Sequence, residues 1–259
     1  MTDLMRVAID AARETGKLLL DRWGRIRSVE AKDDRSLVTD VDREAEALIR
    51  ARIAAAFPSH AILGEEHGGS CDGADTVWVI DPLDGTHNYI RGIPLFGVSI
   101  GVIHRGAFVA GVIGIPAEGL LYAAEHGAGA SVNGKRIAVS TRREPASWSV
   151  GLDSDLRTGF AGKARVLEEL GRSVFNVRML GSSARSLSLV AEGRLDGLVE
   201  FFDKPWDFAA GVAIVEEAGG RVTTFGGGAL PCASSAYVAG GAETHRWLLD
   251  LVRVPARGA

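Results

Sequence analysis

An apolar stretch that runs directly into two acids constrains the fold of this chain more than any other sequence feature. Residues 78–80 are Trp-Val-Ile, and Asp-Pro-Leu-Asp-Gly follows at once at 81–85. Proline fixes its own φ angle and glycine permits a sharp turn, so the segment predicts a short buried strand that ends in a stiff turn. Both carboxylates then lie at the end of one strand, where they can point into one pocket.

This acidic pair has two interpretations. Asp81 and Asp84 taken alone are typical of an Asx turn, in which a carboxylate accepts only backbone hydrogen bonds. Thr86 follows directly, however, and a second acidic pair lies upstream at 65–66 between glycines. Hard cations such as Mg²⁺ prefer carboxylate oxygens, so the combination favours a metal site. The backbone amides of Gly85 and Thr86 are candidates for binding phosphate if a helix or nest starts there.

Another acid opens a later helix. Asp207 follows Trp206, and the small residues at 209–211 permit close packing of this helix against a sheet. An aspartate at a helix start usually caps it, and capping is the simpler interpretation of Asp207 alone.

The composition is that of a globular protein and limits its partners. Of 259 residues, 46% are hydrophobic and 24% charged, and the net charge is −4 without a run of Lys or Arg. We therefore expect neither a nucleic-acid partner nor an anionic membrane surface. No apolar run approaches the roughly 20 residues that cross a bilayer, and the N-terminus lacks a signal-peptide pattern. The two cysteines have no CxxC spacing, so we expect no disulfide framework and a cytoplasmic location.

Periodicity predicts a mixed α+β chain with sheets between helical layers. A polar loop is expected over 25–38, and Asn133-Gly134 indicates a hairpin turn. A soft boundary near 141–145 divides the chain into subdomains 1–142, with most of the acidic ligands, and 143–259, with Asp207, packed as one compact unit. Helices are expected at about 3–23, 40–56, 158–171, 182–192, 206–218 and 243–252. Strands are expected at about 77–80, 98–104, 109–115, 120–125, 129–139, 147–152, 174–179, 195–200, 221–223 and 236–239.

Taken together, these motifs resemble those of the inositol monophosphatase family, within the superfamily of lithium-sensitive, metal-dependent phosphatases. The resemblance covers nearly the whole chain in order. Its two long signatures match residues 78–88 and 206–220, and the shorter matches are Lys32, 36–42, 64–66, 181–184 and 196–197.

The resemblance implies a layered αβαβα sandwich of the inositol monophosphatase/fructose-1,6-bisphosphatase type, usually a homodimer, and a magnesium-dependent phosphatase. It implies that Glu65, Asp81 and the Leu83 carbonyl bind one Mg²⁺. It implies that Asp81, Asp84 and Asp207 bind a second, and that Asp42 reaches a third ion through water. Thr86 would help Glu65 to position and deprotonate the attacking water. The implied contacts to phosphate and substrate are Gly85, Thr86, Gly181, Ser182, Ser183 and Glu200.

Several roles stay open at this point. Glu66 either supports Glu65 or is solvated, and Lys32 either meets the phosphate or extends from a mobile loop. Glu200 accepts substrate hydroxyls or is a surface carboxylate. His87 is better interpreted as a residue of the pocket rim than as an acid or base.

The resemblance implies hydrolysis of a small phosphorylated metabolite, with inositol 1-phosphate leading. The alternatives are histidinol phosphate, then fructose 1,6-bisphosphate or NADP(H). A different class is a regulatory binding protein that kept the fold.

Overall fold

The computed structural model describes residues 1–32 and 36–253 and contains seven helices longer than one turn among them. No helix in this described part is both long and apolar enough to cross a membrane. The helices are α1 (Asp3–Arg22), α2 (Asp40–Ala56), α3 (Thr86–Ile90), α4 (Phe160–Ser173), α5 (Ser183–Ala191), α6 (Pro205–Glu217) and α7 (Ala242–Arg253), with short 3₁₀ turns at Pro116–Glu118 and Pro145–Ser147.

The larger sheet has seven strands in sequence order, β3 to β9. Only β3 and β4 pair in parallel, and every other neighbour is antiparallel. The strands are β3 (Ala61–Gly64), β4 (Thr76–Asp84), β5 (Gly97–His104), β6 (Ala107–Ile115), β7 (Leu120–Glu125), β8 (Gly129–Val132) and β9 (Lys135–Arg136). The turn between β8 and β9 is the hairpin predicted at Asn133-Gly134, and both residues have positive φ.

The smaller sheet has five strands in the order β11-β10-β12-β14-β13. β10 is parallel to β11 and β12, whereas β14 is antiparallel to both of its neighbours. The strands are β10 (Ser149–Leu152), β11 (Asn176–Arg178), β12 (Gly197–Asp203), β13 (Arg221–Thr224) and β14 (Ser235–Gly240).

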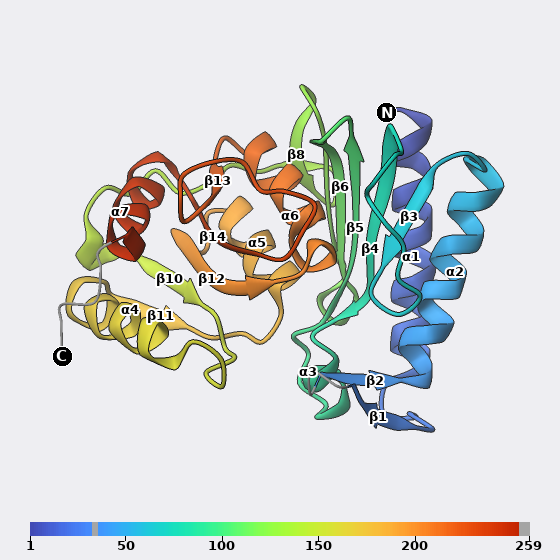
Figure 1. Ribbon diagram of the computed structural model, residues 1–259, viewed down its shortest axis with the longest axis horizontal. Coiled ribbons are helices and arrows are strands. Elements are labelled where there is room, and N and C mark those ends of the chain that lie inside the picture. Colours follow the sequence, from blue (N-terminus) through green and yellow to red (C-terminus); the bar gives the residue numbers. More distant parts are fainter. Residues whose placement is uncertain (33–35, 254–259) are drawn as a thin grey trace.

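The elements stack as five layers, helix, sheet, helix, sheet, helix (Figure 1). α1 and α2 cover the outer face of the larger sheet, α5 and α6 lie between the two sheets, and α4 and α7 cover the outer face of the smaller sheet. The expected αβαβα architecture is confirmed.

The central helix α6 approaches the larger sheet unusually closely. A Cβ atom built on Gly101 of β5 would lie 2.7 Å from the Cβ of Ala209, and one on Gly111 of β6 would collide with the backbone of Ala210. Small residues on both surfaces therefore bring the start of α6 against β5 and β6. Because α6 also contacts β4, Asp207 lies near the acids of β4.

The prediction of a polar loop over residues 25–38 is wrong in part. Residues Val29–Ala31 (β1) and Leu37–Thr39 (β2) pair as a small antiparallel ribbon. β1 is only three residues long and all three are exposed, so the segment is too short to give the alternation over four to eight residues by which a strand is predicted from sequence. Residues 33–35 lie outside the described part of the chain.

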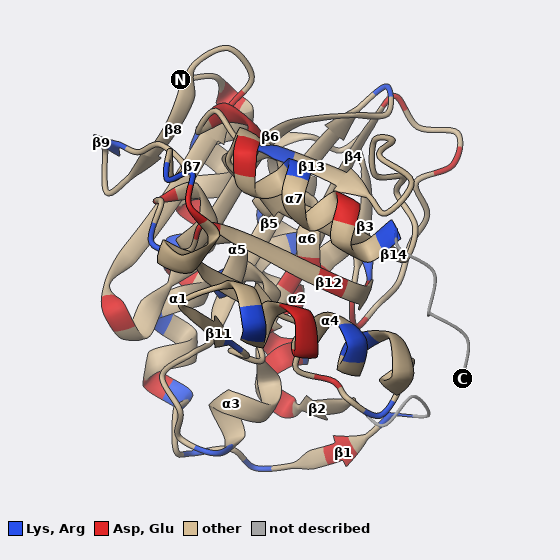
Figure 2. Cartoon of the chain, turned by 90° about the vertical axis from the view of Figure 1, so that its left-hand side faces the viewer, with Lys and Arg blue, Asp and Glu red and all other residues tan. Residues whose placement is uncertain are grey.

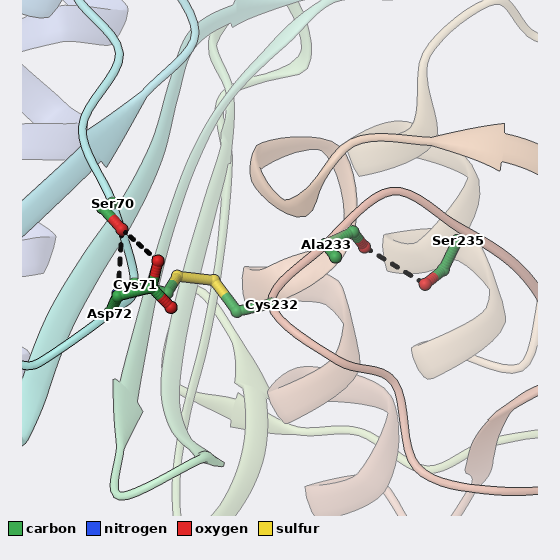
Figure 3. Close-up of a disulfide and its surroundings, with 6 residues drawn as sticks. All are labelled: Ser70, Cys71, Asp72, Cys232, Ala233 and Ser235. Carbon is green, nitrogen blue, oxygen red and sulfur yellow. Dashed lines mark hydrogen bonds between the residues drawn. A yellow bond between two sulfur atoms is a disulfide. The ribbon is translucent and has the colours of Figure 1, made fainter.

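The expectation of no disulfide framework is also contradicted. Cys71 and Cys232 form a disulfide with a Cα–Cα distance of 6.4 Å across 161 residues of chain (Figure 3). Cys71 lies in the loop between β3 and β4, and Cys232 in the loop between β13 and β14. Cysteine spacing could not reveal the pair, because only the packing of the two sheets brings these loops together.

Reduction of this disulfide is expected to lower the free energy of unfolding by about 2–4 kcal/mol, because the cross-link closes a long loop in the unfolded chain. Guanidinium unfolding with and without dithiothreitol measures the difference. A Cys71→Ser/Cys232→Ser variant should match the reduced protein and ignore the reductant. A reductant effect that persists in this variant would show that the bond is not its origin.

Candidate active site

Strand β4 carries two of the acids predicted to bind metal. The strand does not end before them as expected but continues to Asp84. Asp81 and Asp84 are three positions apart and would face opposite sides of a regular strand. The pairing with β5 shifts register between them, and such a bulge re-aims side chains, so both carboxylates reach the same cluster.

Asp207 completes this cluster from α6. Asp81, Asp84 and Asp207 each offer an oxygen, and the three oxygens lie within 4.8 Å of one another. One oxygen of Asp207 accepts a hydrogen bond from the Lys204 amide at 2.7 Å, which caps the helix. Capping and metal binding are therefore compatible at this residue, since a carboxylate has two oxygens.

Asp84 also ties the two halves of the chain together. Its carboxylate accepts hydrogen bonds from the backbone amides of Ser183 (3.2 Å) and Ala184 (3.1 Å) and from the hydroxyl of Ser182. These groups form the N-terminus of α5, whose positive dipole end favours a carboxylate. The hydroxyl of Ser182, predicted to contact substrate, therefore holds Asp84 in place.

Gly85 makes the turn between the acids and α3 possible. Its φ of 83° is left-handed, and a Cβ there would lie 2.8 Å from the carbonyl oxygen of Leu95. Only glycine fits this combination of conformation and space. Asn88, in the next turn, lies within hydrogen-bond distance of the carbonyls of Leu180 (2.8 Å) and Gly181 (3.2 Å). It thereby fixes Gly181 beside the acids, a positioning role that the sequence analysis did not foresee.

Thr86 and Asp42 meet at the start of two helices. The Thr86 hydroxyl lies 3.2 Å from Asp42 Oδ1 and 3.0 Å from the carbonyl oxygen of Leu83. Asp42 is fully buried and also accepts a hydrogen bond of 2.8 Å from the backbone amide of Thr39. The two residues, 44 positions apart, thus form one hydrogen-bonded unit beside the acids of β4.

Lys32 bridges the upstream acidic pair. Its ammonium lies 2.8 Å from Glu65 and 2.6 Å from Glu66, so it does not extend freely from its loop. The Glu66 side chain is 5% exposed, which answers the open question about this residue: it is not solvated. Glu66 supports the position of Lys32 and, through it, of Glu65.

Burial makes the charged form of these acids costly. Desolvation raises the pKa of Glu65 to about 7, although the positive charge of Lys32 opposes this rise. Desolvation also raises the pKa of Asp84 to about 6, and here the hydrogen bonds from Ser182 and the N-terminus of α5 oppose the rise. Desolvation followed by repulsion from neighbouring carboxylates raises the pKa of Asp81 and of Asp207 well above the ordinary value. A buried, oxygen-rich cluster with one nearby lysine fits hard divalent cations such as Mg²⁺.

A cavity of about 600 Å³ opens beside the cluster. Lys32 and Phe202 also line it, whereas His87 is exposed and does not. The cavity includes these predicted site residues: Glu65, Asp84, Asp207, Gly181, Ser182, Ser183 and Glu200.

Three further acids line the cavity and were not predicted from the sequence: Asp153, Asp155 and Asp203. Asp203 lies four residues before Asp207 and three after Glu200. That spacing offers no periodic signal, because Asp203 turns into the cavity only through an irregularity of β12.

Comparison with known proteins agrees with this geometry. The model of the inositol monophosphatase family matches residues 1–254. A protein of Pseudomonas aeruginosa called Nus factor SuhB is 37% identical over 98% of this chain and 97% of its own length. A fructose-1,6-bisphosphatase/inositol-1-monophosphatase of Aquifex aeolicus is 36% identical over 96% of this chain and 95% of its own. The crystal structure of extragenic suppressor protein suhB from Bartonella henselae superposes with a TM-score of 0.93 at 32% identity, covering 100% of both chains.

The layered fold and the acidic cluster define a phosphoric monoester hydrolase of the metal-dependent class. The chain belongs to the inositol monophosphatase family, as its motifs indicated.

Proposed function

We propose that this protein hydrolyses small phosphate monoesters with Mg²⁺, with inositol 1-phosphate as the leading substrate. The observation that carries the proposal is the convergence of Asp81, Asp84 and Asp207 within 4.8 Å at the edge of the cavity. The name of the Aquifex relative contains both inositol-1-monophosphatase and fructose-1,6-bisphosphatase, so it supports the leading substrate and one of the alternatives. The acids would hold two ions, and Asp42 would reach a third through water.

The proposed ligands fall into two sets that share Asp81. Glu65, Asp81 and the Leu83 carbonyl would hold one ion, and Asp81, Asp84 and Asp207 the other. When bound, Mg²⁺ supplies a lower pKa for coordinated water and charge stabilisation at the entering and leaving oxygens.

The remaining chemistry falls to the protein's own groups. Thr86 donates its single hydroxyl hydrogen to the Leu83 carbonyl or to buried Asp42, and either choice leaves the Oγ1 lone pairs to orient the attacking water beside Glu65. Desolvation, partly offset by hydrogen bonds from Thr39, raises the pKa of Asp42 to about 6, so this carboxylate can receive a proton near neutral pH. The amides of Gly85 and Thr86 hold the phosphate.

A phosphate-release assay tests the proposal. Inositol 1-phosphate, histidinol phosphate, fructose 1,6-bisphosphate and NADP are offered with Mg²⁺ and with a chelator. We expect turnover that Mg²⁺ supports and the chelator abolishes. If none of the four esters releases phosphate, the result would favour the alternative of a regulatory binding protein. The name Nus factor of the Pseudomonas relative points to that alternative.

Replacing Thr86 by valine is expected to lower kcat by about 10²-fold, since the variant keeps the shape but loses the hydroxyl that orients water. Mg²⁺ affinity, measured by calorimetry, should change little because Thr86 is not a proposed ligand. Thr76→Val, at the start of β4 and outside the lining of the cavity, is the matched control. Equal losses in both variants would indicate a general effect of replacing threonine by valine instead.

We also propose subdomains at 1–142 and 143–259, a homodimer and a cytoplasmic location. The subdivision is supported by the strands, because those of the larger sheet precede residue 142 and those of the smaller sheet follow it. The homodimer rests on the family resemblance. In the cytoplasm the Cys71–Cys232 pair would be open to reduction. In the view of Figure 2, Lys and Arg are scattered among Asp and Glu, and the absence of a nucleic-acid partner stays a prediction.

A further inference from the structure

Two acids that the proposed metal sites do not use lie side by side on β12. Glu200 and Asp203 both line the cavity. They are three positions apart and would face opposite sides of a regular strand. The pairing of β12 with β14 shifts register between Glu200 and Asp203, and this irregularity directs both carboxylates inward. The fold thus places two acidic side chains together in the cavity that Asp84 and Asp207 also line.

Neither of these carboxylates has a cationic partner within the described residues. Glu200 is 6% exposed, and its carboxylate accepts no hydrogen bond from residues 1–32 or 36–253. Asp203 is buried and accepts the hydroxyls of Tyr237, at 2.8 Å, and Ser183. Asp153, nearby, differs because Lys163 lies 2.6 Å from it. Buried carboxylates normally have a cationic partner. A cation that binds in the cavity would supply one to Glu200 and Asp203.

A metal ion is not the best partner for this pair. Within the described part of the chain, the one group of three acidic or histidine side chains at metal-binding distances is Asp81, Asp84 and Asp207. Glu200 and Asp203 therefore lack a third ligand of this kind. An organic cation needs no such cage, because an ammonium donates three hydrogen bonds to separate acceptors.

A polyol is a weaker match than an ammonium. Its hydroxyls can donate to Glu200, but unlike an ammonium they bring no positive charge to offset the cost of ionising buried carboxylates. The cavity mouth also offers an apolar surface, since Phe202 is 66% exposed beside Trp206. A cation with a short organic body fits both features.

We propose that Glu200 and Asp203 form an ammonium-binding subsite, so that the preferred substrates are phosphate esters of amino alcohols. This inference rests on the proposed phosphatase activity and reorders its substrates: amino-alcohol esters, of which histidinol phosphate is one, come before inositol 1-phosphate. Esters of polyols remain substrates, held through hydroxyls at Glu200, but are turned over less efficiently.

Matched ester pairs test the subsite. Serinol phosphate and glycerol 1-phosphate differ in one ammonium for one hydroxyl, and histidinol phosphate differs from its deamino analogue by the ammonium alone. With Mg²⁺ present, we expect kcat/KM to be about tenfold higher for the amino ester of at least one pair, as for one charge-assisted hydrogen bond. Equal values within both pairs overturn the subsite. Absence of any turnover instead contradicts the phosphatase activity on which the inference rests.

Two isosteric variants locate the effect. Glu200→Gln and Asp203→Asn should each reduce the ratio of amino to hydroxyl ester kcat/KM by about tenfold. Asp155→Asn, a cavity acid already paired with Arg157 at 2.8 Å, is the matched control and should keep the ratio. An equal fall of this ratio in Asp155→Asn would show that the overall negative charge of the cavity, and not the pair Glu200 and Asp203, favours the amino ester, which would overturn the subsite. A loss of one bound Mg²⁺ in Glu200→Gln or Asp203→Asn, measured by calorimetry, would assign the pair to a metal and overturn the proposal.

Discussion

Asp81→Asn is expected to lower phosphate release from inositol 1-phosphate by about 10³-fold, as for the loss of one preorganised electrostatic group from an active site. Asp81 is the acid shared by both proposed ligand sets. Asparagine keeps the shape and the oxygen that accepts the Leu83 amide at 2.9 Å, so the turn at the end of β4 is preserved. The lost activity would therefore report charge and metal binding rather than misfolding.

The same substitution is expected to stabilise the protein in the presence of a chelator. Asp81 is 1% exposed, and its pKa is raised by desolvation and then by Glu65, Asp84 and Asp207. A folded-state pKa raised above the unfolded value destabilises the folded wild-type protein at pH 8, whereas asparagine does not ionise. We expect the free energy of unfolding to rise by about 1–2 kcal/mol, as often found when buried charged groups are replaced.

Opposite changes in activity and stability distinguish this account from general damage. Phosphate release is measured with saturating Mg²⁺, and urea unfolding is measured with a chelator at pH 8. Asp75→Asn, whose exposed side chain lies 3.4 Å from Arg105, should change neither. An Asp81→Asn protein that loses both activity and metal-free stability would contradict the electrostatic interpretation of the cluster.

Local patterns sufficed to predict much of this fold. The helix at 40–56 has the predicted bounds because Thr39 caps it and Pro58 follows it closely. The strands of the larger sheet, except β3, followed from apolar runs separated by glycine turns. The architecture itself came from the family resemblance, since periodicity specifies elements but not how sheets and helices stack.

The candidate site was predictable as a set of residues but not as a geometry. The register shift in β4 depends on its pairing with β5, and no local signal at residues 81–84 specifies it. The contacts of Lys32 with Glu65 and of Asn88 with Gly181 depend on loops that meet only after the layers pack. Asp203 was missed for the same reason. Long-range contacts of this kind are set by tertiary structure, whereas caps and turns are set by neighbouring residues.

The acidic cavity is also expected to give the metal-free protein an unusual dependence of stability on pH. Four acids have folded-state pKa values well above their ordinary values, about 7 for Glu65 and Asp203 and about 6 for Asp42 and Asp84. Desolvation is the largest cause in each case. Because the folded state binds these protons more tightly than the unfolded state, their contribution to stability is fully present below about pH 4 and lost as pH rises through 6 and 7.

With a chelator, the free energy of unfolding should therefore fall by about 3–5 kcal/mol between pH 5 and pH 8, a large part of the ~5–15 kcal/mol of a typical domain. Mg²⁺ should reverse the loss and stabilise more at pH 8 than at pH 5, since protons and metal compete for the same oxygens. Urea unfolding across this range, with and without Mg²⁺, measures both effects. Asp81→Asn should flatten the metal-free slope because it removes one source of repulsion. A metal-free protein that became more stable from pH 5 to pH 8 would show that these acids are not crowded together in the folded chain.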